Sequence, residues 1–354
     1  MVEYRRTTEE AWREIRAKRH QPPANAHRKP RRLLFAAAMK QSEQFFRLSD
    51  LAGYETKPIL LYYGLNQAAR GLIAAAARPN EPWELNAHGL TCPNLNEART
   101  IGDVTVVDQG SGKSFQMLAK YTWCPTLPVK VQLRELWASL PEGATVPLQG
   151  SHDICMALRL FASTQHLGSN GTTLAYPKAA ASLFGLPRHR SVDELRQVLR
   201  ERYPSMRRFS PLVAEDGRVH TLINAWSDRG TISLVAESDV QTGYIDNVMI
   251  TSCGPEIYSD RNALSKSTWV IPTLAGNDEP LKPIVTWWAV LFTLSMLARY
   301  QPSSWTKMLD IDSSPDAPAV EYLLDEAHRV CVNLILDAFA IVERAAFFED
   351  EQSE

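Results

Sequence analysis

The sequence predicts a mainly α-helical protein of the α+β class, and three observations support that fold class. Two segments, 59–77 and 284–298, are apolar on most faces, as expected of helices buried among other helices. Hydrophobic residues make up 45% and charged residues 22% of the 354 residues, which permits a core of several helical layers. Strand-like patterns gather in the middle of the chain. We therefore expect a helical core formed by the N- and C-terminal segments, with a smaller β-containing insertion between them.

The individual helices follow from capping patterns and from hydrophobic periodicity. Thr7 and Glu10 form a capping-box pattern, as do Ser191 and Glu194, and Pro58 suits the first turn of a helix. Apolar residues at helical spacing extend these starts. The predicted helices lie at about 7–20, 31–51, 59–77, 130–139, 152–166, 191–202, 282–300 and 317–347.

Strands are predicted where apolar and β-branched residues gather between turn residues. Two short strands, 104–107 and 115–118, flank a glycine-rich turn. The other predicted strands are 219–226, 231–237, 244–251 and 267–272, with turns at Asp216-Gly217 and Arg229-Gly230. The chain then divides into a helical segment at 1–100, a mixed α/β region at 101–279 and a helical segment at 280–354 that completes the core.

Composition and charge exclude several classes of protein. The net charge is −2, so the whole molecule is not a general polyanion binder, although residues 1–50 hold twelve Lys and Arg against six Asp and Glu. The apolar run at 284–298 is short for a membrane span, and the charged N-terminus contains no apolar signal segment. The five cysteines are scattered and form no C-x-x-C pair. We expect a cytoplasmic protein with reduced thiols, no metal site, no cofactor and no membrane contact.

Three unusual segments occur in a characteristic order along the chain. They are KPILLYYGLNQAARGLIAA at 57–75, ELNAHGLT at 84–91 and LSMLARYQPSSWTKML at 294–309. Their order and approximate spacing resemble the YaaC-like family of bacterial proteins, and the resemblance extends along most of the chain. The family has no well-established activity and is similar to proteins that turn up beside bacterial defence genes. The resemblance therefore implies an antiviral role without supplying a mechanism.

The segment 109–115, QGSGKSF, follows an apolar stretch and is similar to a Walker A phosphate-binding loop. That loop needs the pattern G-x-x-x-x-G-K-[ST], because its first glycine lets the backbone wrap around the phosphates. Here Val107 stands where the first glycine belongs, and 115–120 is strand-like. We therefore interpret the segment as an exposed β-turn whose Lys113 binds no nucleotide.

Arg159 and His166 match the spacing of the Arg–His pair in helical HEPN-type ribonucleases. On a helix this spacing places both side chains on one face. Arg13 and His20 have the same spacing, so the pattern has little specificity. Together with His88, Arg159 and His166 are the candidate catalytic residues.

Charged residues within or beside the apolar segments define the candidate ligand site. Arg70 lies within the 59–77 helix, Arg299 ends the 284–298 run, and His88 follows the first of these helices by one loop. Buried polar groups need partners, so these three residues are expected to lie close together. The cluster is either an anion or nucleotide pocket in which His88 acts as acid and base, or a structural network that locks the two helices.

On the final helix, His328 lies three positions after Asp325. An ion pair within that helix is the expected role of this histidine.

A basic segment near the N-terminus is a candidate contact for nucleic acid. Arg28, Lys29, Arg31 and Arg32 would bind through phosphates, although few aromatic residues accompany them for base stacking. The competing interpretation is a solvated linker.

The leading functional hypothesis is a helical scaffold or accessory protein in a bacterial antiviral defence or stress-response assembly. Its partners would be other copies of the chain or neighbouring defence components. The alternatives are a HEPN-like ribonuclease or nucleotide-processing hydrolase, and then a nucleic-acid-binding module. Whether the protein is an enzyme stays open at this level.

Overall fold

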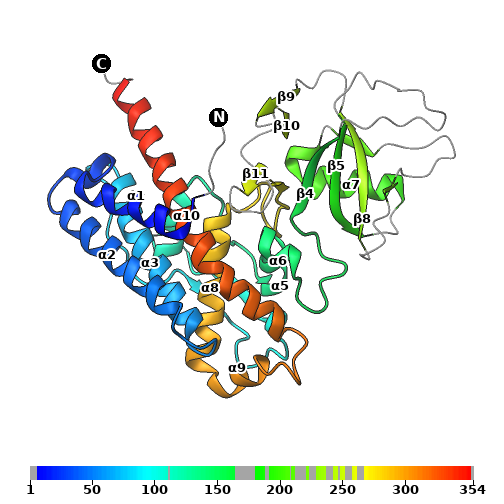
Figure 1. The fold of residues 1–354 in the computed structure, drawn as a ribbon, viewed down its shortest axis with the longest axis horizontal. Helices are drawn as coiled ribbons and strands as arrows, with labels where there is room; N and C mark the ends of the chain where they lie inside the picture. The colour runs from blue at the N-terminus through cyan, green and yellow to red at the C-terminus, as the bar shows by residue number, and fades with distance from the viewer. Residues whose placement is uncertain are drawn as a thin grey trace.

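The computed structural model describes residues 6–110, 112–163, 180–187, 191–207, 209–211, 221–222, 229–236, 242–245, 248–251, 257–260 and 267–351. Its helices are α1 (Thr8–His20), η1 (Ala24–His27), α2 (Arg31–Ser49), α3 (Lys57–Ala76), η2 (Ile101–Asp103), α4 (Ser114–Tyr121), α5 (Leu133–Ala138), α6 (Pro141–Thr145), α7 (Val192–Arg202), η3 (Pro204–Met206), α8 (Pro283–Tyr300), α9 (Pro302–Met308) and α10 (Ala317–Glu351). Its strands are β1 (Leu90–Thr91), β2 (Thr105–Asp108), β3 (Val131–Gln132), β4 (Leu158–Ser163), β5 (Ala180–Pro187), β6 (Phe209–Pro211), β7 (Thr221–Leu222), β8 (Arg229–Ala236), β9 (Thr242–Ile245), β10 (Val248–Thr251), β11 (Ile257–Asp260) and β12 (Ser267–Val270). Figure 1 shows a helical body with the larger sheet to one side of it, which confirms the predicted fold class.

Helices α3 and α8 pack directly against each other inside the helical body, as the sequence predicts. The Tyr62 ring of α3 lies 5.6 Å from the rings of both Trp288 and Phe292 of α8, in edge-on contacts. Leu61 and Leu291 are completely buried. Because both helices are apolar over most of their surface, their contact removes apolar surface from water. This burial stabilises the fold by about 25 cal/mol for each Å² removed.

Helix α2 approaches α3 closely because α3 has a glycine at the contact. A Cβ atom at Gly64 would lie 2.9 Å from the Phe46 ring, a distance that real Cβ atoms essentially never show. The Ser42 hydroxyl of α2 donates to the carbonyl oxygen of Gly64 at 2.8 Å. A small residue inside this apolar helix therefore sets the distance between two helices.

The long helix α10 completes the body by packing on α1, α3 and α8. The main hydrophobic core joins buried residues from Ala11 to Val342, and it includes residues between Ile101 and Leu148. The helical body thus contains α4 and α5 as well as the terminal segments.

The larger sheet is antiparallel at each of its described pairings. Its strand order is β11-β12-β4-β5-β8-β6, and β7 also pairs with β8. A second hydrophobic cluster joins α7, through Leu195 and Leu199, to Phe209 and Val270 of this sheet. The Tyr203 hydroxyl, just after α7, donates to the Met156 carbonyl oxygen at 2.8 Å.

Three predictions for the middle region are wrong. Residues 158–163 form strand β4 instead of the predicted helix at 152–166, because β5 and β12 pair with β4 on its two sides. Residues 115–118 lie in helix α4, where Phe115, Leu118 and Ala119 are buried at helical spacing. Arg229 and Gly230 begin strand β8 rather than form a turn. The predicted turn at Asp216-Gly217 lies outside the described residues.

The helix starts predicted from Thr7, Ser191 and Pro58 are confirmed. Thr7 and Ser191 each form the complete capping box with the glutamate three residues later, and Pro58 lies in the first turn of α3. Over the part of the chain that the structure describes, none of the helices combines the length and the apolar character that crossing a bilayer requires.

The α3–α8 contact predicts a large difference between two leucine substitutions. Leu291→Ala leaves a cavity in the core and should lower the free energy of unfolding by about 2–5 kcal/mol. Leu33→Ala is the matched control, because Leu33 is 72% exposed on α2 and its loss should cost less than about 0.5 kcal/mol. Chemical denaturation of both variants measures the difference, and equal effects would contradict the central position of α8.

Candidate functional site

The structure brings Arg70, His88 and Arg299 into one polar cluster, as the sequence predicts. Arg70 comes from α3, Arg299 from the end of α8, and His88 from the loop after α3. The Tyr62 hydroxyl and the Nδ1 atom of His88 lie 2.7 Å apart, and the His88 ring packs on Phe292 with centroids 5.8 Å apart. All three predicted residues are partly buried.

The two arginines have polar partners without opposite charge. Nη1 of Arg299 donates to the Tyr63 hydroxyl at 3.0 Å, and its Nε donates to the Ser295 carbonyl oxygen at 3.3 Å. The contacts of Arg70 are longer, at 3.4 Å to the Asn66 side-chain oxygen and 3.5 Å to the Leu85 carbonyl oxygen. In the described part of the chain, neither guanidinium forms an ion pair with a carboxylate.

The surroundings of His88 disfavour the protonated form of its imidazole. Burial is the largest cause that lowers the pKa of the His88 imidazole, and the positive charges of Arg299 and then Arg70 lower it further. Burial also raises the pKa of the Tyr62 hydroxyl well above its ordinary value. The cluster therefore presents two permanent cations beside an imidazole that resists a third positive charge.

The loop that carries His88 has an unusual backbone on both sides of this residue. Ala87 has φ 55° and Gly89 has φ 87°, so both adopt the left-handed conformation. The N-terminal end of α4 holds this loop, because the Phe115 amide donates to the His88 carbonyl oxygen at 3.1 Å. Gln116 donates to the Gly89 carbonyl oxygen at 2.8 Å. Backbone strain of this kind is often retained where it positions a functional side chain.

The sequence interpretation missed the two tyrosines of this cluster. Tyr62, Asn66 and Arg70 are spaced four residues apart, so they share one face of α3. Tyr63 supplies the hydroxyl that receives Arg299, and its ring lies 5.8 Å from that guanidinium. A polar row with helical spacing inside an apolar helix was the signal that could have identified Tyr62.

The segment resembling a Walker A loop connects β2 to α4, so a helix does follow it, contrary to prediction. Strand β2 lies between β1 and β3 in an antiparallel sheet. The Ser114 hydroxyl, which would bind the metal ion in a Walker A loop, donates instead to the Ala87 carbonyl oxygen at 2.5 Å. Nζ of Lys113 donates to the Gln109 side chain at 3.3 Å. Ser114 therefore serves to anchor the His88 loop.

The Arg–His pair proposed from HEPN spacing loses its helical basis. Arg159 lies on strand β4, where its backbone pairs with Phe184 and Trp269. His166 lies outside the described residues. The spacing argument required both residues on one helix, so it does not apply to this chain.

The basic segment near the N-terminus contains one residue with a structural role. Arg31 is buried, and its guanidinium donates to the carbonyl oxygens of Ala77 and Arg78 at the end of α3. Arg28, Lys29 and Arg32 are exposed. Arg31 is thus unavailable for phosphate contacts, and nucleic-acid binding through the other three stays a prediction.

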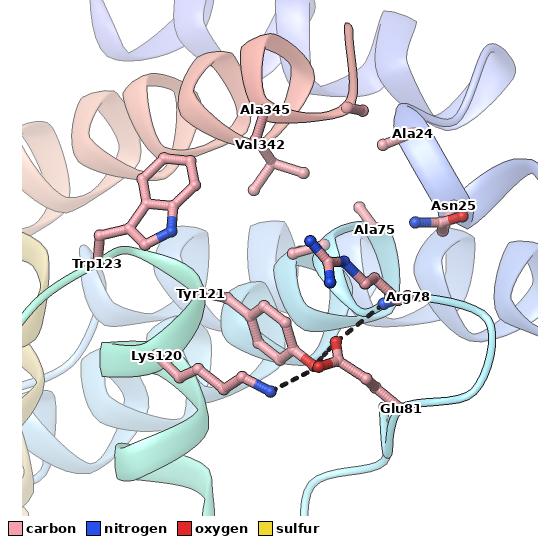
Figure 2. A pocket seen from close by; sticks show the side chains of 12 residues that line it. Ala24, Asn25, Ala75, Arg78, Glu81, Lys120, Tyr121, Trp123, Val342 and Ala345 are labelled. Carbon is pink, nitrogen blue, oxygen red and sulfur yellow. Dashed lines mark hydrogen bonds and ion pairs between the residues drawn. The ribbon is translucent and has the colours of Figure 1, made fainter. Parts of the chain in front are cut away.

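A separate cavity lies between the C-terminal ends of α3 and α4 and helix α10 (Figure 2). It has a volume of about 310 Å³ and is lined by Tyr121 and Trp123, by the end of α3, and by alanines of α10. It contains none of the residues predicted for the anion site.

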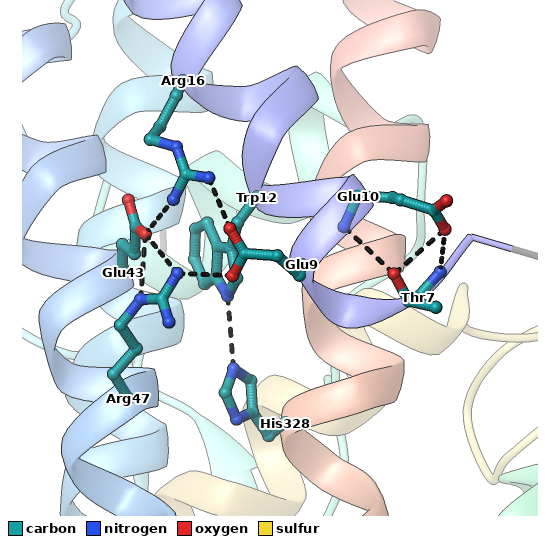
Figure 3. A network of polar contacts seen from close by, with 8 residues as sticks. All are labelled: Thr7, Glu9, Glu10, Trp12, Arg16, Glu43, Arg47 and His328. Carbon is teal, nitrogen blue, oxygen red and sulfur yellow. Dashed lines mark hydrogen bonds and ion pairs between the residues drawn. The ribbon is translucent and has the colours of Figure 1, made fainter.

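The predicted ion pair between His328 and Asp325 is wrong, because both residues have other partners. Nδ1 of His328 lies 2.8 Å from the carboxylate of Asp50, the residue just after α2, and Trp12 of α1 donates to Nε2 of His328 at 3.2 Å. Asp325 accepts from Lys57 at 2.5 Å. Figure 3 shows Trp12 and His328 beside a group of ion pairs between α1 and α2. His328 therefore joins α10 to the two N-terminal helices.

These observations define a class: a helical protein with a cationic arginine–histidine cluster between its central helices. A family model described as YaaC-like protein matches residues 3–339, so the chain belongs to the YaaC-like protein family, as expected. No curated protein and no solved structure matches the chain significantly. Among the residues that the structure describes, no group of three or more His, Cys, Asp or Glu is placed to hold a metal ion.

The geometry of the His88 loop predicts different effects for two glycine substitutions. Gly89→Ala and Gly110→Ala both introduce a side chain at a left-handed residue, at a cost of about 1–2 kcal/mol. Only at Gly89 would the new Cβ also lie 3.0 Å from the Phe115 amide nitrogen, whereas nothing lies within 4 Å at Gly110. Thermal denaturation should therefore show a clearly larger loss of stability for Gly89→Ala. Equal losses would show that α4 does not hold the loop as described.

Proposed function

We propose that this protein binds a small anionic ligand at the cluster of Arg70, His88 and Arg299 and serves as a helical accessory component of a larger assembly. One observation carries this proposal. Both arginines lie near enough to His88 for their charges to lower its pKa, and neither is paired with a carboxylate among the described residues.

A partly buried cation without a counter-ion is electrostatically costly, because burial removes part of its hydration. In a purely structural network we would expect a carboxylate partner for at least one of the two arginines. The hydrogen bonds of Arg70 are also long, so its donors remain poorly used. An anionic ligand would supply both the missing charge and the missing acceptors.

The ligand class follows from the donors that the cluster offers. Guanidinium groups bind planar or tetrahedral oxyanions through paired N–H donors, so carboxylate, sulfate and phosphate groups fit this chemistry. A neutral His88 would add a donor or an acceptor according to its tautomer. The enzymatic alternative is a nucleotide-processing hydrolase that uses the same cluster, with His88 as acid and base. Such an enzyme would convert its ligand to a product, whereas a binding protein would release the ligand unchanged.

The role in a bacterial antiviral defence or stress-response assembly is proposed on the family resemblance. If the anion site serves this role, a cell expressing the Arg299→Gln variant should lose phage resistance or stress tolerance while it retains normal amounts of folded protein. If cells that express Arg299→Gln keep their phage resistance and stress tolerance, the cellular role does not depend on the anion site.

Binding measurements test the anion site directly. Arg70→Gln and Arg299→Gln should each weaken the binding of sulfate or pyrophosphate about 10- to 100-fold, because each removes charged donors worth about 1.5–3 kcal/mol. Arg16→Gln is the matched control, since Arg16 already pairs with Glu9 at 2.6 Å and Glu43 at 2.5 Å on another face. Isothermal titration calorimetry gives the affinities, and circular dichroism checks the fold. No saturable binding by the unmodified protein would refute the proposal.

The pH dependence gives an independent test with a definite sign. The pKa of His88 is lowered in the free protein by burial and by Arg299 and Arg70, and a bound anion should raise it again by offsetting those charges. Binding then takes up a proton, so sulfate affinity should rise as the pH falls from 8 to 5.5. Sulfate is suitable because its charge is constant over this range. His88→Gln should remove the pH dependence of the sulfate affinity. If the affinity of that variant changes with pH as before, a group other than His88 causes the pH dependence.

A further inference from the structure

The cavity of Figure 2 has two chemically different sides. Ala75 and Ala76 of α3 and Ala345 and Ala346 of α10 form small apolar walls. On the other side, Tyr121 and Lys120 at the end of α4 face Glu81. Short alanine side chains leave open a space that larger residues would fill, and its volume of about 310 Å³ suits a small ligand.

Trp123 differs from the large buried tryptophans of this protein. Its side chain is 60% exposed at the edge of the cavity, whereas Trp12, Trp137, Trp287, Trp288 and Trp305 are almost completely buried. Figure 2 shows the indole at one side of the cavity, with the Arg78 guanidinium projecting toward the open space from the other side. More than half of the Trp123 surface is therefore in contact with solvent, and the Lys282 ammonium lies 5.8 Å from the centre of the indole ring.

The backbone of Trp123 is in a conformation that a bulky residue rarely adopts. Trp123 has φ 48° just after the end of α4, in the left-handed position that usually holds glycine at the C-terminus of a helix. Its amide donates to the Lys120 carbonyl oxygen at 3.1 Å, and the Cys124 amide donates to the Ala119 carbonyl oxygen at 2.9 Å. The chain thus fixes an exposed indole at a strained position, which is a feature of functional sites.

The polar side of the cavity is held in place by Glu81. Its carboxylate accepts from Nζ of Lys120 at 2.8 Å, from the Tyr121 hydroxyl at 2.9 Å and from the Arg78 amide at 3.1 Å. These hydrogen bonds, with Lys120 first, lower the pKa of Glu81 to about 2. An ammonium group has three donors, and the bond to Glu81 uses one of them. Two donors of the Lys120 ammonium therefore remain for acceptor oxygens of a ligand, while Glu81 holds the side chain in place.

We propose that this cavity binds a nucleoside monophosphate, with its base against the Trp123 indole and its phosphate at Lys120. A flat ring matches the exposed indole face, because aromatic surfaces stack in offset or edge-on contacts worth about 0.5–1.5 kcal/mol beyond their burial. The phosphate matches the ammonium group, and the alanine walls accommodate the ring and sugar. This cavity shares no lining residue with the anion site, whose His88 loop contacts the N-terminal end of α4.

Titration of the full chain with AMP, GMP, CMP and UMP, followed by tryptophan fluorescence and calorimetry, tests the proposal. At least one nucleotide should bind with saturation and quench the fluorescence, and it should bind at least tenfold more tightly than its nucleoside or inorganic phosphate. Trp123→Gly should weaken binding at least tenfold without lowering the thermal midpoint, because glycine relieves the left-handed strain. Trp123→Leu also removes the indole ring, but it does not add the backbone freedom that glycine brings, so it tests the loss of the ring alone.

Two more variants make the result specific to the cavity. Ala345→Leu should block the cavity and weaken nucleotide binding, although every polar group of the cavity remains. Tyr300→Leu is the control and should leave nucleotide binding unchanged, because Tyr300 is an aromatic residue that is 59% exposed and does not line the cavity. Arg299→Gln should also bind the nucleotide normally. The proposal is overturned if no nucleotide binds, if Trp123→Gly and Ala345→Leu bind like the unmodified protein, or if Arg299→Gln abolishes binding. The last result would place the nucleotide in the anion site.

Discussion

The contact between Tyr62 of α3 and the aromatic residues of α8 is the interaction on which the rest of the helical body depends. The ring of Tyr62 packs edge-on against Trp288 and Phe292 in the core, while the Tyr62 hydroxyl lies within hydrogen-bond distance of His88. One side chain therefore joins the apolar packing to the polar cluster. Because burial of apolar surface provides most of the stability of such a body, the helices fix the positions of the charged groups at their edges.

The arginines of this protein fall into two groups with different surroundings. In the network of Figure 3, Arg16 and Arg47 share the carboxylates of Glu9 and Glu43, and these pairs join α1 to α2. Arg70 and Arg299 lie nearer the core, where a carboxylate would help more, yet their described partners are neutral. This contrast within one chain favours a binding role for the second group over a purely structural one.

The parts of the fold that local rules determine were predictable from sequence. Capping boxes at Thr7 and Ser191 depend on residues three positions apart, and the apolar surfaces of α3 and α8 leave packing against each other as the simplest arrangement. Strand β4 was predicted as a helix, because its pairing with β5 and β12 is a long-range property. For the same reason, the partners of His328 could not be inferred from its own helix.

The candidate site shows the same division between local and long-range information. The sequence predicted that Arg70, His88 and Arg299 lie close together because polar groups on buried helices need partners, but the structure pairs the two arginines with neighbouring hydroxyl, amide and carbonyl oxygens. The left-handed backbone at Ala87 was not visible, since alanine gives no local signal for that conformation. Tyr63 was overlooked because its role requires the end of α8 to lie beside it.

Helix α4 links the two sites and explains why a short helix has so many specific contacts. At its beginning, Ser114, Phe115 and Gln116 hold the loop of His88 through hydrogen bonds to three successive carbonyl oxygens. Its end carries Lys120 and Tyr121, which Glu81 fixes at the cavity. Between these ends, Leu118 and Ala119 are buried in the helical body. A rigid, buried connector of this kind keeps the distance between the two sites constant, so a substitution at either end can be interpreted only when the other end is shown to be intact.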